Sequence, residues 1–277
     1  MRVVITGGGG FLGRAVAREL ASGVVEVIGV SRRNLPGLLQ VDDYALAPAG
    51  DVLVHLAEAS DRGWVEANRS WYEQKALDVL GALIDKGFRR VVYASSAVLY
   101  GDQVRVPRDV DEPVRVVDCY TRLKRLSELE VLNRDGVAAR LVNLYGLGMA
   151  VGNVLSTILK QLPLDGPVRV LDTTPVRDFL WIEDAGKALA AMALGEGAGI
   201  YNVGTSQGTS VAELAKVMLE AAGQVGRAVE SENEGTCCSH LVVDIGRTTA
   251  QFGWRPETSL EEGIKTLVKK YIQEGTT

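Results

Sequence analysis

Residues 1–13 read MRVVITGGGGFLG, and this stretch decides the fold that we expect. The β-branched run Val3 to Ile5 suits a buried parallel strand, whereas residues 14–21 continue a helical stripe of apolar side chains that starts at Phe11. A strand, a glycine turn and a helix in this order direct free N–H groups and a helix N-terminus at one point. The stretch therefore predicts an anion cradle, suited to the pyrophosphate of a dinucleotide.

The glycines fit two spacings, because Gly8, Gly10 and Gly13 give GxGxxG while Gly7, Gly10 and Gly13 give GxxGxxG. Tight turns also use glycine for positive φ angles without binding a ligand. The position after a strand and before a helix favours the cofactor-binding interpretation. Thr6 and the motifs described below favour the GxxGxxG frame.

Length and composition limit the class of protein. The 277 residues can form one large α/β domain, or a main domain with a lobe, and 47% hydrophobic with 23% charged residues is an ordinary globular composition. A net charge of −5 argues against a nucleic-acid or anionic-membrane surface. We expect a cytoplasmic protein, because no export signal and no membrane-spanning apolar run is recognisable. The spacing of Cys119, Cys237 and Cys238 predicts neither a metal site nor a disulfide framework.

Strands and helices alternate through the first half of the chain. This order predicts an α/β fold with a doubly wound parallel sheet, the Rossmann arrangement. Beyond Tyr145 the pattern becomes irregular, and we expect a smaller, mixed C-terminal substrate lobe. The predicted division is 1–145 for the dinucleotide-binding domain, to which 178–205 returns, and 146–177 with 206–277 for the lobe. The expected strands are 24–30, 51–56, 90–94, 138–142 and 168–171, and the expected helices are 69–86, 120–133, 154–161, 183–194 and 211–222.

The residues at the end of the second predicted strand bear on the choice between NAD and NADP. An NAD site usually places an acidic residue there to accept a hydrogen bond from the ribose 2′-hydroxyl, but this chain has Ser31, Arg32 and Arg33. Arginine supplies the charge and the bidentate geometry that a 2′-phosphate requires. We therefore expect NADP, with NAD as the alternative; two solvated surface arginines would explain the same residues without a ligand.

Catalytic chemistry is indicated by Tyr120 and Lys124, four residues apart on one helix face, together with Ser96 at the end of a predicted strand. Bringing the pKa of a tyrosine from ~10 toward neutrality takes about 4 kcal/mol, comparable to one ammonium ~4 Å away at an effective dielectric near ~20. A tyrosine tuned in this way exchanges a proton with a carbonyl or carbinol oxygen while a nicotinamide exchanges hydride with the carbon. The same spacing also occurs on ordinary helices, where the tyrosine packs against its neighbours and the lysine extends to solvent without any catalytic role.

The chain resembles the extended short-chain dehydrogenase/reductase family, the NAD-dependent epimerase/dehydratase group that acts on nucleotide sugars. The resemblance covers nearly the whole sequence. It is carried by residues 6–13, by Tyr120 with Lys124, and by these further motifs: DVLVHLA (51–57), VYASSAVLYG (92–101), RLVNLYG (140–146), RDFLWIED (177–184), YNVG (201–204) and FGWRP (252–256).

The resemblance implies roles for individual residues. Ser96, Tyr120 and Lys124 would be catalytic, and Asn143, Asn153 and Arg177 would contact the sugar nucleotide. Arg177 suits a diphosphate, although a structural ion pair is its competing role. A homodimer through the helices 69–86 and 120–133 is also implied. The cofactor would contact Gly7, Gly10, Phe11, Leu12, Gly13, Leu56 and Ala57, besides Ser31, Arg32, Arg33, Tyr120 and Lys124.

Some residues depart from the family pattern. Ala97 and Val98 stand where the dehydratases have an Asp-Glu pair, which removes the acid and base needed to expel water. Tyr72 stands where an asparagine usually supports the lysine. Glu58 replaces a small residue after HLA, and we expect it to face solvent, with contact to the nicotinamide ribose as the alternative. His55 is expected to be a packed strand residue.

Three hypotheses follow. The first is an NADPH-dependent reductase of a nucleotide-linked 4-keto-6-deoxyhexose, in which C4 receives hydride and Tyr120 donates a proton. The second is a nucleotide-sugar 4-epimerase that retains NAD and returns the hydride. The third is a dinucleotide-binding regulatory protein without catalysis, which has no need of Ser96, Tyr120 and Lys124. The nucleotide and the sugar are not readable from the sequence.

Overall fold

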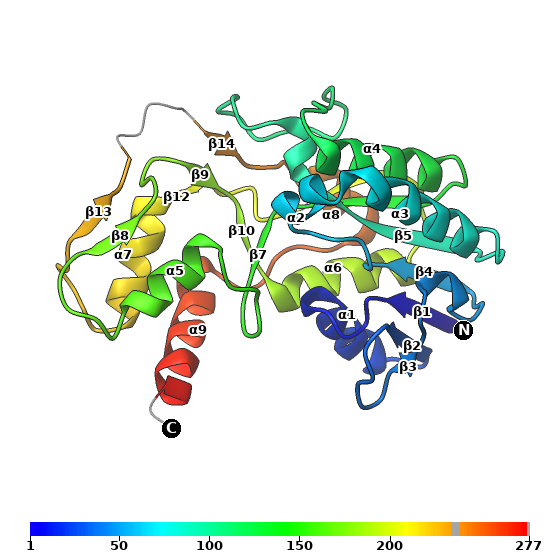
Figure 1. Cartoon of the computed structure of the whole chain (residues 1–277), viewed down its shortest axis with the longest axis horizontal. Helices are drawn as coiled ribbons and strands as arrows, with labels where there is room; N and C mark the ends of the chain where they lie inside the picture. Colours follow the sequence, from blue (N-terminus) through cyan, green and yellow to red (C-terminus); the bar gives the residue numbers. More distant parts are fainter. Residues whose placement is uncertain (234–238, 276–277) are drawn as a thin grey trace.

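A seven-stranded parallel sheet forms the centre of the computed structural model, which describes residues 1–233 and 239–275 (Figure 1). Its strand order is β3-β2-β1-β4-β5-β6-β11, and each neighbouring pair is parallel. The order reverses between β1 and β4, which is the position where open α/β sheets bind ligands. The strands are β1 (Arg2–Thr6), β2 (Glu26–Ser31), β3 (Leu39–Gln40), β4 (Val52–His55), β5 (Arg90–Ser96), β6 (Val137–Leu141) and β11 (Gly199–Val203).

Helices cover both faces of the sheet. Val3 and Ile5 of β1 pack in one cluster with helices α1 (Phe11–Ala21) and α6 (Ile182–Leu194), whereas Val4 packs in another with α3 (Arg69–Ile84) and α4 (Cys119–Leu132). Because successive side chains of a strand point to opposite faces, the continuous apolar run of β1 is buried on both sides. This confirms the doubly wound parallel sheet.

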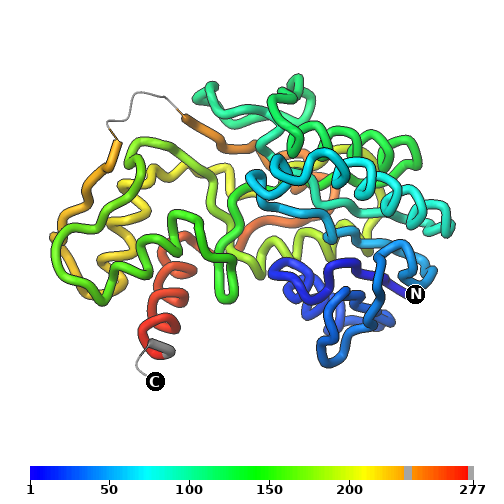
Figure 2. The backbone as a smooth tube through the Cα atoms, in the orientation of Figure 1, coloured from blue at the N-terminus to red at the C-terminus, as the bar shows by residue number. Residues whose placement is uncertain are grey.

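A second hydrophobic cluster lies beside the sheet domain, on the left of Figure 1. Helices α5 (Val154–Gln161), α7 (Val211–Ala221) and α9 (Leu260–Gly275) contribute Ile158, Leu214 and Ile264 to it, and β8 (Val168–Val170) pairs with β13 (Val229–Ser231) at its edge. The chain passes between the two parts repeatedly (Figure 2).

Short strands lie between the two parts. They are β7 (Asn143–Tyr145) paired with β10 (Phe179–Trp181), and β9 (Val176–Arg177) paired with β12 (Thr209–Ser210) and β14 (His240–Leu241). The remaining elements are α2 (Arg62–Ala67), α8 (Gly246–Phe252) and the 3₁₀ turns η1 (Tyr44–Leu46) and η2 (Ala97–Tyr100). Among the described residues, no helix has the length and apolarity needed to span a membrane.

The expected elements are present with ends shifted by a few residues. Helix α1 starts at Phe11 because Gly10 serves as its N-cap, and β2 starts at Glu26 rather than at residue 24. The sequence patterns did not predict β3, β11, α2, α8 or α9. Of these, β3, α2 and α8 are two, six and seven residues long and bury too few apolar residues to produce a readable period. Helix α9 has 16 residues, but it lies in the half of the chain whose sequence pattern is irregular.

Candidate functional site

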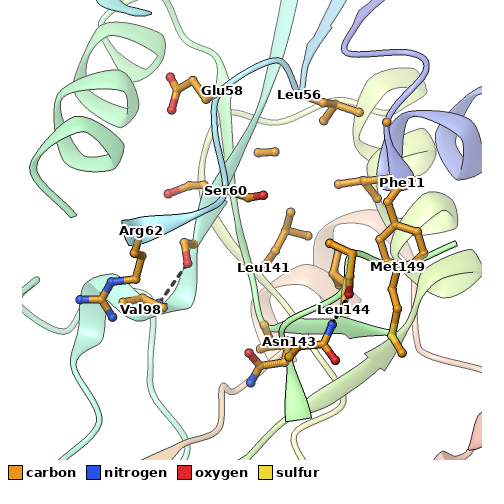
Figure 3. Close-up of a pocket in the computed structure, with 18 of the residues that line it drawn as sticks. Phe11, Leu56, Glu58, Ser60, Arg62, Val98, Leu141, Asn143, Leu144 and Met149 are labelled. Atoms are coloured by element: carbon orange, nitrogen blue, oxygen red, sulfur yellow. Dashed lines mark hydrogen bonds between the residues drawn. The ribbon is translucent and has the colours of Figure 1, made fainter. Parts of the chain in front are cut away.

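A cleft of about 820 Å³ opens at the carboxyl ends of β1, β4 and β5 (Figure 3). These strands end at Thr6, His55 and Ser96, so the loops that follow them form its wall. The other wall comes from the segment around Asn143 and Met149, at the start of the second part. The cleft therefore lies at the sheet's topological switch point and reaches both parts of the chain.

The glycine turn forms one end of the cleft. Gly7 has φ +74°, and a Cβ atom there would lie 2.9 Å from the carbonyl oxygen of Leu56 in the neighbouring loop. A Cβ atom on Gly13 would collide with the carbonyl oxygen of Gly7. Gly7, Gly10 and Gly13 line the cleft with Phe11 and Leu12, while Gly8 and Gly9 do not. The cleft thus uses the GxxGxxG spacing and faces the first turn of α1, whose N–H groups lack helical partners.

A second cavity of about 390 Å³ adjoins the first. His55, Glu58 and Ser60 line both cavities, so the loop after β4 separates them. Arg32 and Ala57 line the second cavity, and the Arg32 guanidinium lies 5.4 Å from the centre of the Tyr44 ring. The two cavities together run from the end of β2 to the end of β5.

The other residues after β2 lie differently. Ser31 is buried, and its hydroxyl accepts a hydrogen bond of 3.0 Å from the backbone N–H of Arg33, whose side chain is exposed. Two carboxylates farther along the chain, Asp42 and Asp43, line the second cavity with Arg32. Asp43 accepts from the Ala45 N–H and pairs with Lys75, whereas Asp42 is exposed.

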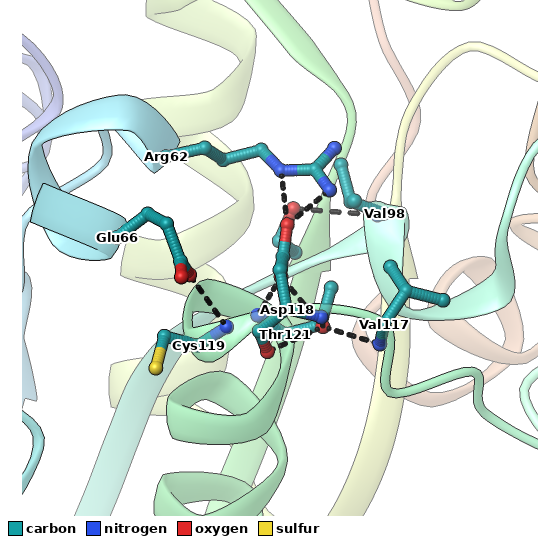
Figure 4. A network of polar contacts seen from close by, with 8 residues as sticks. Arg62, Glu66, Val98, Val117, Asp118, Cys119 and Thr121 are labelled. Atoms are coloured by element: carbon teal, nitrogen blue, oxygen red, sulfur yellow. Dashed lines mark hydrogen bonds and ion pairs between the residues drawn. The ribbon is translucent and has the colours of Figure 1, made fainter. Parts of the chain in front are cut away.

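Polar contacts hold the start of α4, the helix that carries Tyr120 and Lys124 (Figure 4). Asp118 caps this helix and forms a reciprocal capping box with Thr121. Two side chains of α2 contact this turn. Arg62 donates to the Asp118 carboxylate, with Nε 3.0 Å from Oδ2, and Glu66 accepts a hydrogen bond from the Cys119 N–H. These contacts hold the first turn of α4, and with it Tyr120, against α2.

Lys124 is buried, and its ammonium has several partners. Nζ donates to the carbonyl oxygen of Ala94 at 2.8 Å and lies 3.2 Å from Oε2 of Glu58. It also lies 4.9 Å from the ring centre of Tyr93 and 5.8 Å from that of Tyr120. Burial disfavours the charged amine, but the Glu58 carboxylate, together with the nearby tyrosines Tyr120 and Tyr72, raises the pKa of Lys124 above its ordinary value.

The expectation that Glu58 faces solvent is wrong. Its side chain is only 4% exposed, and its carboxylate accepts hydrogen bonds from the Tyr93 hydroxyl at 2.6 Å and the Ser127 hydroxyl at 2.7 Å. Figure 3 shows this carboxylate directed away from Leu56 and the centre of the cleft. Burial opposes ionisation, yet Lys124 and these donors lower the pKa of Glu58 below its ordinary value, so the pair is charged.

Tyr72 supports the same loop instead of Lys124. Its hydroxyl accepts a 2.6 Å hydrogen bond from the N–H of Ala59, next to Glu58. His55 is a packed strand residue as expected, with Nδ1 2.8 Å from the Thr6 hydroxyl, and burial lowers its pKa to about 4. Ser96 lines the cleft, and its hydroxyl accepts from the Val98 N–H at 3.3 Å.

The three residues assigned to the sugar nucleotide also line the cleft. Asn143 is exposed on β7. Asn153 caps α5, with its side-chain oxygen accepting from the Ser156 N–H at 2.9 Å. Arg177 donates to Ser239 and lies 3.6 Å from the Asp102 carboxylate, which is the ion pair considered as its competing role.

Sequence reasoning missed Arg62, which lines the cleft from α2, and the pairing of Glu58 with Lys124. The residue type of Glu58 was the available signal, but a carboxylate in a loop gives no indication of its partner. Among the described residues, no cluster of three or more His, Cys, Asp or Glu side chains is arranged for a metal ion. Cys119 is buried, and Cys237 and Cys238 lie outside the described residues.

Comparison with known proteins gives a consistent family match. The model of the NAD dependent epimerase/dehydratase family matches residues 3–204. A putative UDP-glucose 4-epimerase of Methanocaldococcus jannaschii is 27% identical to this chain, and the aligned region covers 96% of this chain and 97% of that protein. The dTDP-4-dehydro-6-deoxyglucose reductase of Escherichia coli is 21% identical over 96% of each chain.

The fold is shared with solved structures. The protein RMD of Pseudomonas aeruginosa, solved in complex with NADPH, superposes with a TM-score of 0.85 over 99% of each chain at 21% identity. The match extends over both the sheet and the part that carries α5, α7 and α9. At this identity it is a likeness of fold.

Proposed function

The chain belongs to the NAD dependent epimerase/dehydratase family, and on that basis we propose that it reduces a nucleotide-linked 4-keto-6-deoxyhexose with NADPH. The observation that carries the proposal is that Ser96, Tyr120 and Lys124 line the same cleft as the glycine turn. A binding protein without catalysis has no need of this arrangement. Ala97 and Val98, without carboxylates, argue against dehydration of the sugar.

The two cavities suit an extended dinucleotide. The glycine turn and the first N–H groups of α1 would hold the pyrophosphate, and Ser96, Tyr120 and Lys124 lie at the other end of the cleft. Arg32 would bind a 2′-phosphate in the second cavity, where its guanidinium lies over Tyr44. Asp42 and Asp43 line the same cavity and Asp43 pairs with Lys75, so the proposal of a 2′-phosphate rests on the Arg32 guanidinium.

When bound in the cleft, NADPH would supply the hydride that the carbonyl carbon receives. Ser96 would donate a hydrogen bond to the carbonyl oxygen and orient it. Tyr120 would transfer its proton to that oxygen, so the C=O group becomes CH–OH and the tyrosine becomes a tyrosinate that solvent reprotonates. The positive charge of Lys124 stabilises the tyrosinate as it forms.

The opposite side of the cleft would bind the nucleotide sugar. Asn143 is exposed there and available for hydrogen bonding, and Arg177 offers a guanidinium suited to a diphosphate. Binding of a diphosphate by Arg177 would compete with its pairing to Asp102. The side-chain oxygen of Asn153 is engaged as the cap of α5, so we expect Asn153 to contribute less to binding of the nucleotide sugar than Asn143 and Arg177.

A 4-epimerase with retained NAD is the second candidate, and the similarity to the Methanocaldococcus jannaschii protein favours it. An epimerase uses the same tyrosine first as a base and then as an acid, and it consumes no reduced cofactor. The site residues are compatible with either reaction. The cofactor end supports the reductase, because Ser31, Arg32 and Arg33 replace the acid that favours NAD.

The test is an assay of purified protein with dTDP-4-dehydro-6-deoxyglucose or its UDP counterpart and either NADPH or NADH. We expect stoichiometric NADPH consumption and formation of a 6-deoxyhexose nucleotide. Tyr120→Phe should lower kcat by ~10²- to 10⁴-fold while NADPH binding is retained. Interconversion of UDP-glucose and UDP-galactose without net NADPH consumption would instead establish the epimerase.

We also propose a homodimer through α3 and α4. Trp71 on α3 and Leu126 and Leu129 on α4 are large apolar side chains that this chain leaves exposed. Sedimentation analysis of the wild type and of Leu126→Glu checks this, since a charged residue in the interface should yield monomers. The predicted boundaries near residues 145, 177 and 205 remain a proposal that limited proteolysis can examine.

A further inference from the structure

Glu58 and Lys124 form an ion pair inside the proposed reductase site. The side chains are 4% and 7% exposed, and Nζ lies 3.2 Å from Oε2. A buried charge is costly unless it is paired and hydrogen-bonded. Glu58 and Lys124 are each paired with the other, and each has further hydrogen-bond partners. Lys124 has the Ala94 carbonyl as a second partner, and Glu58 has the hydroxyls of Tyr93 and Ser127.

The loop that carries Glu58 is itself fixed. The N–H of Ala59 donates to Tyr72 on α3, and Tyr93 from β5 and Ser127 from α4 hold the carboxylate from two further elements. The carboxylate therefore cannot turn away without breaking several hydrogen bonds. Its position is a built feature of the site rather than one conformer of an exposed side chain.

The charges around Tyr120 are determined by this arrangement. Lys124 is the cation beside the Tyr120 ring, and Glu58 is the anion beside Lys124. The other titratable groups that face the pair are His55 from β4, Tyr93 from β5 and Tyr72 from α3, with Arg32 more distant. Neutral His55 and the protonated tyrosines leave Glu58 as the negative charge that balances Lys124.

We propose that Glu58 is a positioning residue of the reductase site: it fixes the ammonium of Lys124 and offsets its charge, so that Tyr120 retains the proton that it donates. The inference rests on the proposed function. The ammonium of Lys124 lies beside the Tyr120 ring, and the fixed carboxylate of Glu58 offsets the positive charge that would draw a proton from Tyr120. The protonated tyrosine is the form that the reduction uses, because the carbonyl oxygen must receive a proton.

Glu58→Gln removes the charge and keeps the shape of the side chain. The readout is the pH dependence of kcat/KM for NADPH-dependent reduction of dTDP-4-dehydro-6-deoxyglucose. We expect the fall in activity on the alkaline side to begin about one pH unit lower than in the wild type, the scale of one charge a few ångströms away. An unmoved profile, or one moved to higher pH, would overturn the proposal.

Glu73→Gln is the matched control. Glu73 pairs with Arg122 on the same helix as Lys124, but on its exposed side. Loss of the Glu73 charge should leave the alkaline decrease in kcat/KM at the same pH as in the wild type. If both variants shift the profile equally, the effect reflects general charge and the specific role of Glu58 is refuted.

Two further measurements keep the test decisive. Glu58→Asp retains the charge but draws it back by one methylene, and should shift the profile in the same direction by less; no shift would contradict the proposal even if Glu58→Gln fails to fold. If the wild type shows no turnover, the proposed function fails, and tyrosinate absorbance still tests Glu58. The signal that is lost in Tyr120→Phe should appear at lower pH in Glu58→Gln or, in smaller measure, in Glu58→Asp than in the wild type.

Discussion

Arg140 donates two hydrogen bonds of 2.8 Å to the carboxylate of Glu128, and both side chains are fully buried. Ser95, the neighbour of Ser96, donates to the same carboxylate at 2.6 Å. The Tyr100 ring lies 4.7 Å from the guanidinium carbon of Arg140, whose Nη1 atom has no hydrogen-bond partner. The pair thus ties the end of β5 to α4 and β6, next to the proposed catalytic residues.

Glu128→Gln should lower the free energy of unfolding by about 3–5 kcal/mol, because it leaves the Arg140 charge buried without a counter-ion. Denaturant unfolding measures the change. Glu26→Gln, which breaks the exposed pair with Arg2, is the control and should cost less than about 1 kcal/mol. Similar losses in the two variants would show that burial of the Arg140 pair has no special weight.

Arg32→Ala should weaken NADPH binding by ~10- to 100-fold and leave NADH binding nearly unchanged, because a charge-assisted contact to the 2′-phosphate is lost. Fluorescence titration with both cofactors measures this. Arg134→Ala, at an exposed pair with Asp85, is the control. A preference for NADH in the wild type would refute the assignment of Arg32.

His55 should make stability depend on pH. Burial disfavours the imidazolium, Lys124 adds to this and Glu58 opposes it, so the pKa of His55 is about 4 instead of 6.5. Between these values the unfolded chain binds a proton that the folded protein does not. The stability contributed by neutral His55 is fully present above about pH 6.5 and declines as the pH falls toward 4, by up to ~3 kcal/mol.

His55→Gln removes this titration. The difference in unfolding free energy between neutral pH and pH ~4.5 should therefore shrink by ~2 kcal/mol relative to the wild type. His240→Gln changes a less buried histidine and should affect the difference much less. An unchanged pH dependence in His55→Gln would mean that His55 ionises readily in the folded protein.

Asn153 allows its two roles to be separated. Asn153→Ala removes the cap of α5 and should lower stability by about 1 kcal/mol, whereas Asn153→Asp keeps an acceptor oxygen and should not. Asn153→Asp adds a negative charge to the wall of the cleft and should raise the KM for a nucleotide diphosphate sugar. Thermal unfolding and steady-state kinetics of both variants provide the check; equal KM values would remove Asn153 from the substrate site.

Much of the fold and part of the site could be predicted from local patterns. The strand, turn and helix from Arg2 to Ala21 carry their own signals in β-branched residues, glycines and helical periodicity, and the structure confirms them. Tyr120 and Lys124 lie on one helix, so their common side follows from spacing alone. That Ser96 joins them in the cleft follows from its place at the carboxyl end of a parallel strand.

The partners of these residues could not be predicted in this way. Glu58 lies in a loop 66 positions before Lys124, and only the packing of α4 against β5, beside the loop after β4, brings their charges together. Glu128 and Arg140 face each other across a helix and a strand, where no fixed sequence spacing applies. Solvent exposure is the common fate of glutamate, so the burial of Glu58 contradicts a rule that holds on average.

The glycine turn also has unequal evolutionary constraints. A methyl group on Gly7, Gly8 or Gly13 would meet backbone atoms of the loop after β4, of strand β2 or of the turn itself, none of which can move independently. At Gly9 the nearest atoms belong to the side chains of Leu35 and Leu38, which can be exchanged for smaller ones. Homologous sequences should therefore accept alanine at the position of Gly9 where smaller residues replace Leu35 and Leu38. The same sequences should keep glycine at the positions of Gly7, Gly8 and Gly13.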